Sequence, residues 1–321
     1  MAADVPEADG GDDVVSAPGP GTEHGRFLPS VVTLEESMRA GKRSLAEGRL
    51  GEALDHFNAA LRLKPRYDVA WIARGQVLKF QGSHQEALRA FAEALVLKPE
   101  NDEAWMALAS VLHGMRRFEE EVEAYDEILK QNPRNVEALI NKGAALHAVR
   151  KYDVALACYD AVLEMRPEYA PAWNNKGATL LRRGKLDGAL EALARAIHFD
   201  PDLFDAYVNE VFAYQKKGKH GEAVIAADRA LRLRETPWLW HLKGLSHLAL
   251  LESSLALRCF ERALELDPEL KEARGALRKA RDLRTHVDLY RGVYECFGTF
   301  DATDPGCEEC EIQGRCREVT R

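Results

Sequence analysis

Residues 68–101 read DVAWIARGQVLKFQGSHQEALRAFAEALVLKPEN, and residues 102–135 repeat the pattern as DEAWMALASVLHGMRRFEEEVEAYDEILKQNPRN. Aligned without a gap, both have Trp at position 4, a small residue at position 8, an aromatic residue at position 24 and Pro at position 32. A pattern shared over 34 residues indicates a structural repeat.

The same pattern extends outward in both directions. The position-32 prolines fall 34 residues apart at Pro65, Pro99, Pro133, Pro167 and Pro201, and Pro268 continues the series after the loss of one residue. The position-8 glycines are Gly41, Gly75, Gly143, Gly177 and Gly244, and the alanines at position 20 are Ala53, Ala87, Ala155, Ala189, Ala223 and Ala256. The lattice defines seven units: 34–67, 68–101, 102–135, 136–169, 170–203, 204–236 and 237–270.

Each unit predicts two amphipathic helices. Apolar residues recur at three- and four-residue spacing in two runs per unit, which is the periodicity of a helix with one buried face. The proline ends the second helix, because it pushes the residue before it out of the α region. Small residues at positions 8 and 20 let the two helices approach closely where they cross.

These residues resemble the tetratricopeptide-repeat pattern of a bulky residue, Gly, Ala, an aromatic residue and a terminal Pro. The resemblance covers residues 34–270 and implies an all-α fold, a right-handed α-solenoid of seven helical hairpins with a concave inner groove. We expect residues 271–295 to form a capping helix over the last apolar face. In the third unit, Glu121 replaces the small residue at position 20, so we expect either that its carboxylate extends outward or that the crossing is looser.

Charge is concentrated at the ends of the chain. Residues 1–32 carry six acidic residues and one arginine and few large apolar residues, so we expect a disordered acidic leader. The repeats have no net basic charge, which argues against a nucleic-acid partner. No secretory signal is evident, and no stretch reaches the roughly 20 apolar residues of a membrane span. We therefore expect a soluble, cytoplasmic protein.

The resemblance also identifies candidate binding residues. In this family, positions 2, 5, 6, 9, 12 and 13 of each first helix line the groove, and position 6 is Asn141, Asn175 and Asn209 in three consecutive units. An Asn amide both donates and accepts hydrogen bonds, so this ladder is suited to a peptide backbone. Asn174 at position 5, with Arg182 and Lys216 at position 13, would favour a ligand with acidic side chains or a free carboxylate.

Four of the six cysteines lie in the segment 296–321, spaced as Cys296-x10-Cys307-x2-Cys310-x5-Cys316. A Cys-x2-Cys pair is suited to chelating a metal, so these four predict a zinc site, with an iron–sulfur cluster as the alternative. The ending weakly resembles the iron–sulfur staple of certain RecB-type nucleases. Disulfides and unliganded thiols stay open as further alternatives. Cys158 and Cys259 lie inside repeats and are expected to pack in the core.

The function that the sequence favours is a non-catalytic scaffold that holds an extended segment of a partner protein. The alternative is an accessory redox or iron–sulfur protein whose active part is the cysteine segment. Catalysis is disfavoured, because the sequence has no phosphate-binding glycine-rich loop, no HExxH and no GxSxG motif.

Metal analysis and an absorption spectrum of anaerobically purified protein distinguish the two functions. Stoichiometric zinc without colour is expected, because a structural zinc ion bound by thiolates has no visible transition. A broad visible band with bound iron would instead favour the iron–sulfur alternative. A variant with Cys307→Ser and Cys310→Ser is expected to lose the metal, and a Cys158→Ser variant is the control that keeps it.

Overall fold

A computed structural model describes residues 33–282, and the predicted leader and cysteine segment lie outside these residues. Helices account for most of the described chain, and no strand occurs in it. The helices are α1 (Leu34–Ala46), α2 (Leu50–Leu63), α3 (Asp68–Phe80), α4 (His84–Leu97), α5 (Asp102–Gly114), α6 (Phe118–Gln131), α7 (Val136–Ala148), α8 (Tyr152–Met165), α9 (Ala170–Arg182), α10 (Leu186–Phe199), α11 (Phe204–Lys216), α12 (His220–Leu233), α13 (Pro237–Ala249) and α14 (Ser253–Leu266).

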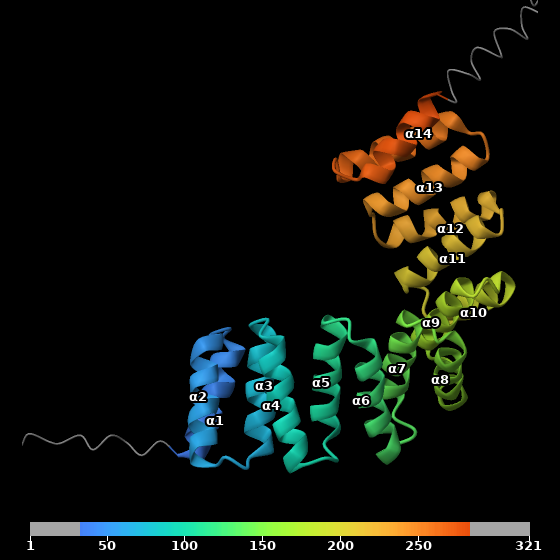
Figure 1. Ribbon diagram of the computed structural model, residues 1–321. Coiled ribbons are helices and arrows are strands. Elements are labelled where there is room, and N and C mark those ends of the chain that lie inside the picture. The colour runs from blue at the N-terminus through green and yellow to red at the C-terminus, as the bar shows by residue number, and fades with distance from the viewer. Residues whose placement is uncertain (1–32, 283–321) are drawn as a thin grey trace, which may run out of the picture.

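The fourteen helices of 34–266 form seven antiparallel hairpins stacked one after another, and the stack turns between α7 and α11, which confirms the predicted helical solenoid (Figure 1). Each helix packs against the helices before and after it in the chain. First helices of adjacent hairpins also touch each other, as α1 touches α3 and α9 touches α11. The first helices therefore line one continuous face of the stack. The pair α5 and α7 approaches less closely than the other neighbouring first helices.

The row continues beyond α14. A further helix begins at 271 and extends to 282, the last residue described. Its Ala276, Leu277 and Ala280 are buried against Leu257 and Phe260 of α14. This described part of the predicted capping helix covers the apolar face that α14 would otherwise leave exposed.

Within a hairpin, the two helices meet where a glycine backbone lies against a ring. A Cβ built on Gly75 would lie 2.6 Å from Cε1 of Phe91, and one on Gly143 would lie 2.5 Å from Cε1 of Tyr159. Real Cβ atoms do not approach carbon so closely. In the units with Gly at position 8, the absence of a side chain there therefore sets the distance between the helices. Unit three has the small, fully buried Ala109 at this position.

Units five and six keep the crossing filled with other residue pairs. In unit five, Gly177 lies against the smaller side chain of Leu193. In unit six, Val211 occupies position 8 and Ala227 occupies position 24, and both are fully buried in one core cluster. The larger side chain has moved from one helix to the other, so the total volume at the crossing is roughly kept.

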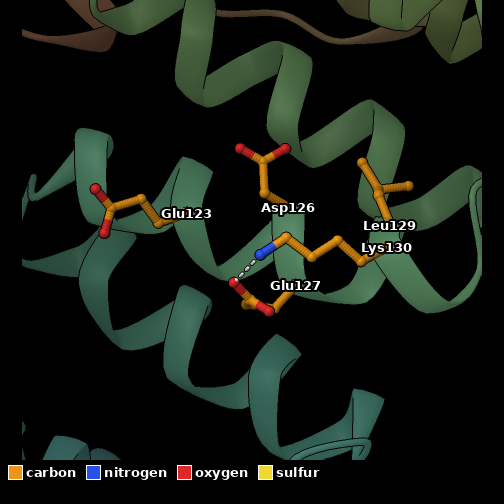
Figure 2. A pocket seen from close by; sticks show the side chains of 5 residues that line it. All are labelled: Glu123, Asp126, Glu127, Leu129 and Lys130. Carbon is orange, nitrogen blue, oxygen red and sulfur yellow. Dashed lines mark hydrogen bonds and ion pairs between the residues drawn. The ribbon is translucent and has the colours of Figure 1, made fainter.

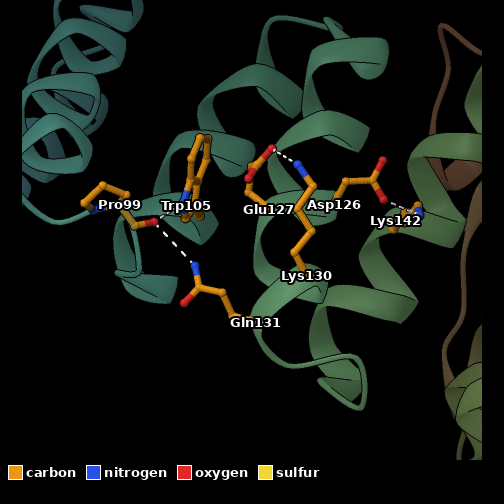
Figure 3. Close-up of polar contacts among 7 residues, drawn as sticks. All are labelled: Pro99, Trp105, Asp126, Glu127, Lys130, Gln131 and Lys142. Carbon is orange, nitrogen blue, oxygen red and sulfur yellow. Dashed lines mark hydrogen bonds and ion pairs between the residues drawn. The ribbon is translucent and has the colours of Figure 1, made fainter.

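Tryptophan and proline, which recur together in the sequence, are joined by a hydrogen bond between units. The indole Nε1 of Trp105 donates to the carbonyl oxygen of Pro99 at 2.8 Å, and Gln131 donates to the same oxygen at 3.4 Å (Figure 3). Trp71 and Trp173 make the same bond to the preceding proline carbonyl. These bonds tie the first helix of a unit to the turn that precedes it.

Unit six lacks this proline, and a side chain replaces its carbonyl. Trp240 donates instead to Oε1 of Glu235 at 2.9 Å, and Arg262 holds the same carboxylate. The side chain of Thr236 caps α13 by accepting from the backbone N–H of Leu239. The connection between units six and seven thus uses side chains where Trp71, Trp105 and Trp173 use a backbone carbonyl.

Ion pairs repeat across unit boundaries from position 7 to position 25 of the preceding unit. Lys142 contacts Asp126 at 2.5 Å (Figure 3), and Lys176 and Lys243 pair with Asp160 and Asp228 in the same way. In unit six, position 7 is Glu210, which is buried and whose Oε2 has no hydrogen-bond partner. Burial raises the pKa of Glu210 above that of an exposed glutamate.

Changing Gly75 to Ala is expected to destabilise the protein by about 1–3 kcal/mol, because the new Cβ overlaps the ring of Phe91. Chemical denaturation followed by circular dichroism measures this loss. Gly51→Ala is the control: no atom lies within 4 Å of its Cβ position in α2, so no loss is expected. Equal effects at the two glycines would contradict the proposed role of the close approach.

Changing Glu210 to Leu is expected to stabilise the protein by about 1–3 kcal/mol at neutral pH, because it removes a buried carboxylate whose Oε2 has no hydrogen-bond partner. The native pKa is raised, so the native state binds the proton more tightly than the unfolded chain. The contribution of Glu210 to the stability of the wild type therefore falls as pH rises above about 4.3, the usual value for glutamate. The advantage of the variant should shrink towards pH 4.

Thermal midpoints measured between pH 4 and pH 8 test this dependence. The exposed Glu191 of α10 provides the control, since Glu191→Leu should shift the free energy of unfolding by no more than about 0.5 kcal/mol. A Glu210→Leu variant with no gain at neutral pH, or with a gain that does not change with pH, is incompatible with a destabilising buried charge at this site.

Candidate functional site

The residues that the sequence predicts for binding lie on three consecutive first helices. Asn141 lies on α7, Asn174, Asn175 and Arg182 on α9, and Asn209 and Lys216 on α11. Because α7 touches α9 and α9 touches α11, these helices bring their equivalent positions next to one another. All four asparagines are half-buried, and both cations are exposed.

The four asparagines are held differently. Nδ2 of Asn209 donates to Oδ1 of Asn174 at 2.9 Å, which joins two units across their boundary. Asn141 lies within interaction range of the Tyr125 hydroxyl. The side chain of Asn175 makes no hydrogen bond within the described residues. Of the three asparagines at position 6, Asn175 is therefore the one whose side-chain amide has no interaction partner within the described residues.

Arg182 and Lys216 differ from the cations beside them in their ion pairing within the described residues. The cations that follow them in sequence, Arg183 and Lys217, pair with Asp153 and Asp187 of the preceding units. Arg182 and Lys216 form no ion pair within residues 33–282. Burial, reinforced by the charge of Arg182, lowers the pKa of His147. This edge of α9 and α11 is consequently positive.

A pocket that sequence reasoning missed opens beside Asn141. It encloses about 480 Å³ and is lined by residues of α3, α5, α6 and α7. Glu121 of α6 lines it with only 2% of its surface exposed, and the Nδ1 of His113 lies 3.1 Å from both carboxylate oxygens. The expectation that Glu121 extends outward is wrong. The signal in the sequence was a carboxylate at a position that is alanine in the other six units.

The sequence profile of the tetratricopeptide repeat matches residues 72–136, 140–203 and 204–237. The chain belongs to the tetratricopeptide-repeat family.

Solved structures are similar to this tetratricopeptide-repeat chain in fold. A tetratricopeptide repeat protein from Parabacteroides merdae shares 23% identity with a TM-score of 0.63, and the match covers 77% of this chain and 98% of that one. PilF of Pseudomonas aeruginosa shares 19% identity with a TM-score of 0.54, over 65% of this chain and 95% of that one.

A third similar structure is the Cut9–Hcn1 complex of the APC/C, with 16% identity and a TM-score of 0.57. That match covers 79% of this chain and 49% of the other. No curated protein sequence matches this chain. These structural likenesses establish the arrangement of helices and do not identify a ligand.

A second cleft of the tetratricopeptide stack, about 440 Å³, lies along α6 and contains several acids (Figure 2). Two of these acids are already neutralised, because Glu127 pairs with Lys130 at 2.5 Å and Asp126 pairs with Lys142. Glu123 extends away from the other residues in Figure 2. The cleft therefore has no convergent set of free polar groups, and we do not assign it a ligand.

The tetratricopeptide core contains no group of three metal-type side chains within residues 33–282. Cys158 and Cys259 are buried and unpaired, and burial raises the pKa of Cys259 to about 11. The predicted metal ligands Cys296, Cys307, Cys310 and Cys316 all lie outside the described residues. None of the helices in the described range is long and apolar enough to cross a membrane.

Proposed function

We propose that the face formed by α7, α9 and α11 binds an extended segment of a partner protein and that the protein is a non-catalytic scaffold. The observation that carries this proposal is the set of half-buried amides on adjacent first helices, bordered by two cations that form no ion pair with any residue of 33–282. An extended peptide backbone offers donors and acceptors in alternation, and an Asn side chain can satisfy both.

The Asn174–Asn209 hydrogen bond supports the proposal because it orients both amides before a ligand arrives. An Asn amide has two N–H donors and a carbonyl with two lone pairs, so this single bond leaves each side chain with further hydrogen-bonding capacity. Each hydrogen bond to a peptide contributes about 0.5–1.5 kcal/mol net. Side-chain interactions must add to these bonds to give a specific complex.

Charge on the groove edge favours an acidic ligand. Arg182 and Lys216 lie at position 13 of adjacent units and are exposed. A carboxylate of the bound segment, from a side chain or a chain terminus, can take up both charges. We propose that the partner has an acidic residue where its chain passes α9 and α11.

The cysteine segment remains a separate proposal, with zinc as the metal and an iron–sulfur cluster as its alternative. A cytoplasmic location and the lack of a nucleic-acid partner also remain predictions from the sequence. Neither bears on the groove, whose binding chemistry comes from α7, α9 and α11.

A variant with Asn141→Ala, Asn175→Ala and Asn209→Ala is expected to bind partners from a cell extract about tenfold or more weakly, because up to three amide contacts are lost. Affinity enrichment with quantitative mass spectrometry compares the variant with the wild type, and circular dichroism checks its fold. A variant that recovers every wild-type partner in the same amount contradicts the ladder.

A charge pair provides the matched control. Arg182→Ala with Lys216→Ala should weaken binding of the same partners and reduce its dependence on salt. Arg183→Ala with Lys217→Ala removes two neighbouring cations that already have acidic partners, and binding should change much less. Equal losses in both double variants would indicate a general charge effect and would contradict an acidic contact at this edge.

A further inference from the structure

The pocket beside Asn141 differs in construction from the rest of the groove. It opens at the boundary of units three and four, where α5 and α7 approach less closely than other neighbouring first helices. Most of its lining comes from the groove-facing positions of α5 and α7. Glu121 and Tyr125 come from α6, which is a second helix. Side chains from behind the groove therefore form the floor of this pocket.

Glu121 brings a buried carboxylate to that floor. The equivalent residue in the other six units is a fully buried alanine, so the crossing itself does not need a long side chain. Its contacts are His113 Nδ1, at 3.1 Å, and the Tyr125 hydroxyl, within interaction range. Burial raises the pKa of Glu121, and His113 opposes the shift. A buried carboxylate is costly unless a cation completes its environment.

The charges around the pocket are also predominantly acidic. Glu103 and Glu137 line it from position 2 of α5 and α7, and both are exposed. The lysine that lines it is Lys79, whose Nζ lies 2.6 Å from Oγ of Ser110. Three carboxylates thus face one lysine, with His113 charged only when protonated.

We propose that this pocket binds the side chain of an arginine. The inference deepens the proposed function, because the arginine would belong to the segment held in the same groove. A guanidinium carries five N–H donors in a plane and pairs with carboxylates in two-point contacts. Glu121, Glu137 and the carbonyl of Asn141 supply acceptors around one cavity. The His113 side chain is 60% exposed and can leave Glu121 without opening the core.

The two charged regions together specify a ligand. The pocket on α5, α6 and α7 selects a basic residue, and the edge on α9 and α11 selects an acidic one. A segment lying along the groove then carries both charges in a fixed order. This order gives the bound chain one direction, which backbone contacts with asparagine amides alone do not.

The test uses Nα-acetyl-arginine N-methylamide, a probe too short to span the asparagine ladder. Its titration into the full chain is followed by NMR signals of the His113 and Tyr125 rings. Saturable shifts with a millimolar dissociation constant are expected for the wild type. Glu121→Gln keeps the shape of the side chain and removes its charge, so affinity should fall about tenfold or more. Glu121→Ala restores the residue of the other units and should give the same loss.

A variant that is expected to raise the affinity for the probe separates the effect of charge from that of packing. Lys79→Ala removes the cation that lines the pocket, and affinity for the probe should rise roughly threefold. Glu123→Gln, on α6 but outside the pocket, should leave affinity unchanged. The citrulline analogue of the probe is neutral and should not bind.

Three results would overturn the inference: no saturable shift in the wild type, equal affinity of wild type and Glu121→Gln, or equal binding of arginine and citrulline. Tighter binding of the lysine analogue would overturn the choice of arginine. The variant with Asn175→Ala and Asn209→Ala should bind the probe normally. Failure of the probe therefore leaves the ladder untouched, and failure of the ladder leaves the pocket untouched.

Discussion

The close approach of two helices at a glycine is the constraint on which the rest of this structure depends. Gly75 and its equivalents bring an α-helical backbone against an aromatic ring, and alanine at position 20 keeps the other side of the crossing small. The hairpins therefore have similar dimensions, and hairpins of similar dimensions stack into a regular row. That row in turn places equivalent residues of successive first helices side by side, which is the basis of the binding face.

Much of this fold could be predicted from the sequence, because the 34-residue spacing of the repeat is visible in the sequence itself. The prolines and glycines fix the phase of every unit, and the two apolar runs place both helices. The hydrogen bonds that join units were not predictable in the same way. The bond from Trp105 to the carbonyl of Pro99 has no signature beyond the co-occurrence of the two residues. The replacement of this carbonyl by the Glu235 side chain depends on a turn geometry that the period does not encode.

The binding face was predictable in its placement and not in its interactions. A fixed period guarantees that Asn141, Asn175 and Asn209 occupy equivalent positions. Which amide is engaged depends on neighbours from other positions, as the bond between Asn209 and Asn174 illustrates. Glu121 left two outcomes open because its placement depends on the space where α5 and α6 cross. That space is a property of packing, and single positions in a sequence do not report it.

The residue pairs at the crossing have a consequence for how such repeats diverge. Gly177 with Leu193, and Val211 with Ala227, fill the same place with different divisions of volume between the helices. A large change in volume at one member alone leaves the hairpin either overfilled or hollow, and both states cost stability. Such a change should therefore be matched on the other helix, as in unit six, where Val211 replaces the glycine and Ala227 replaces the aromatic residue. The residues at positions 8 and 24 should therefore covary among the units of one chain, as residues in contact covary among homologous chains.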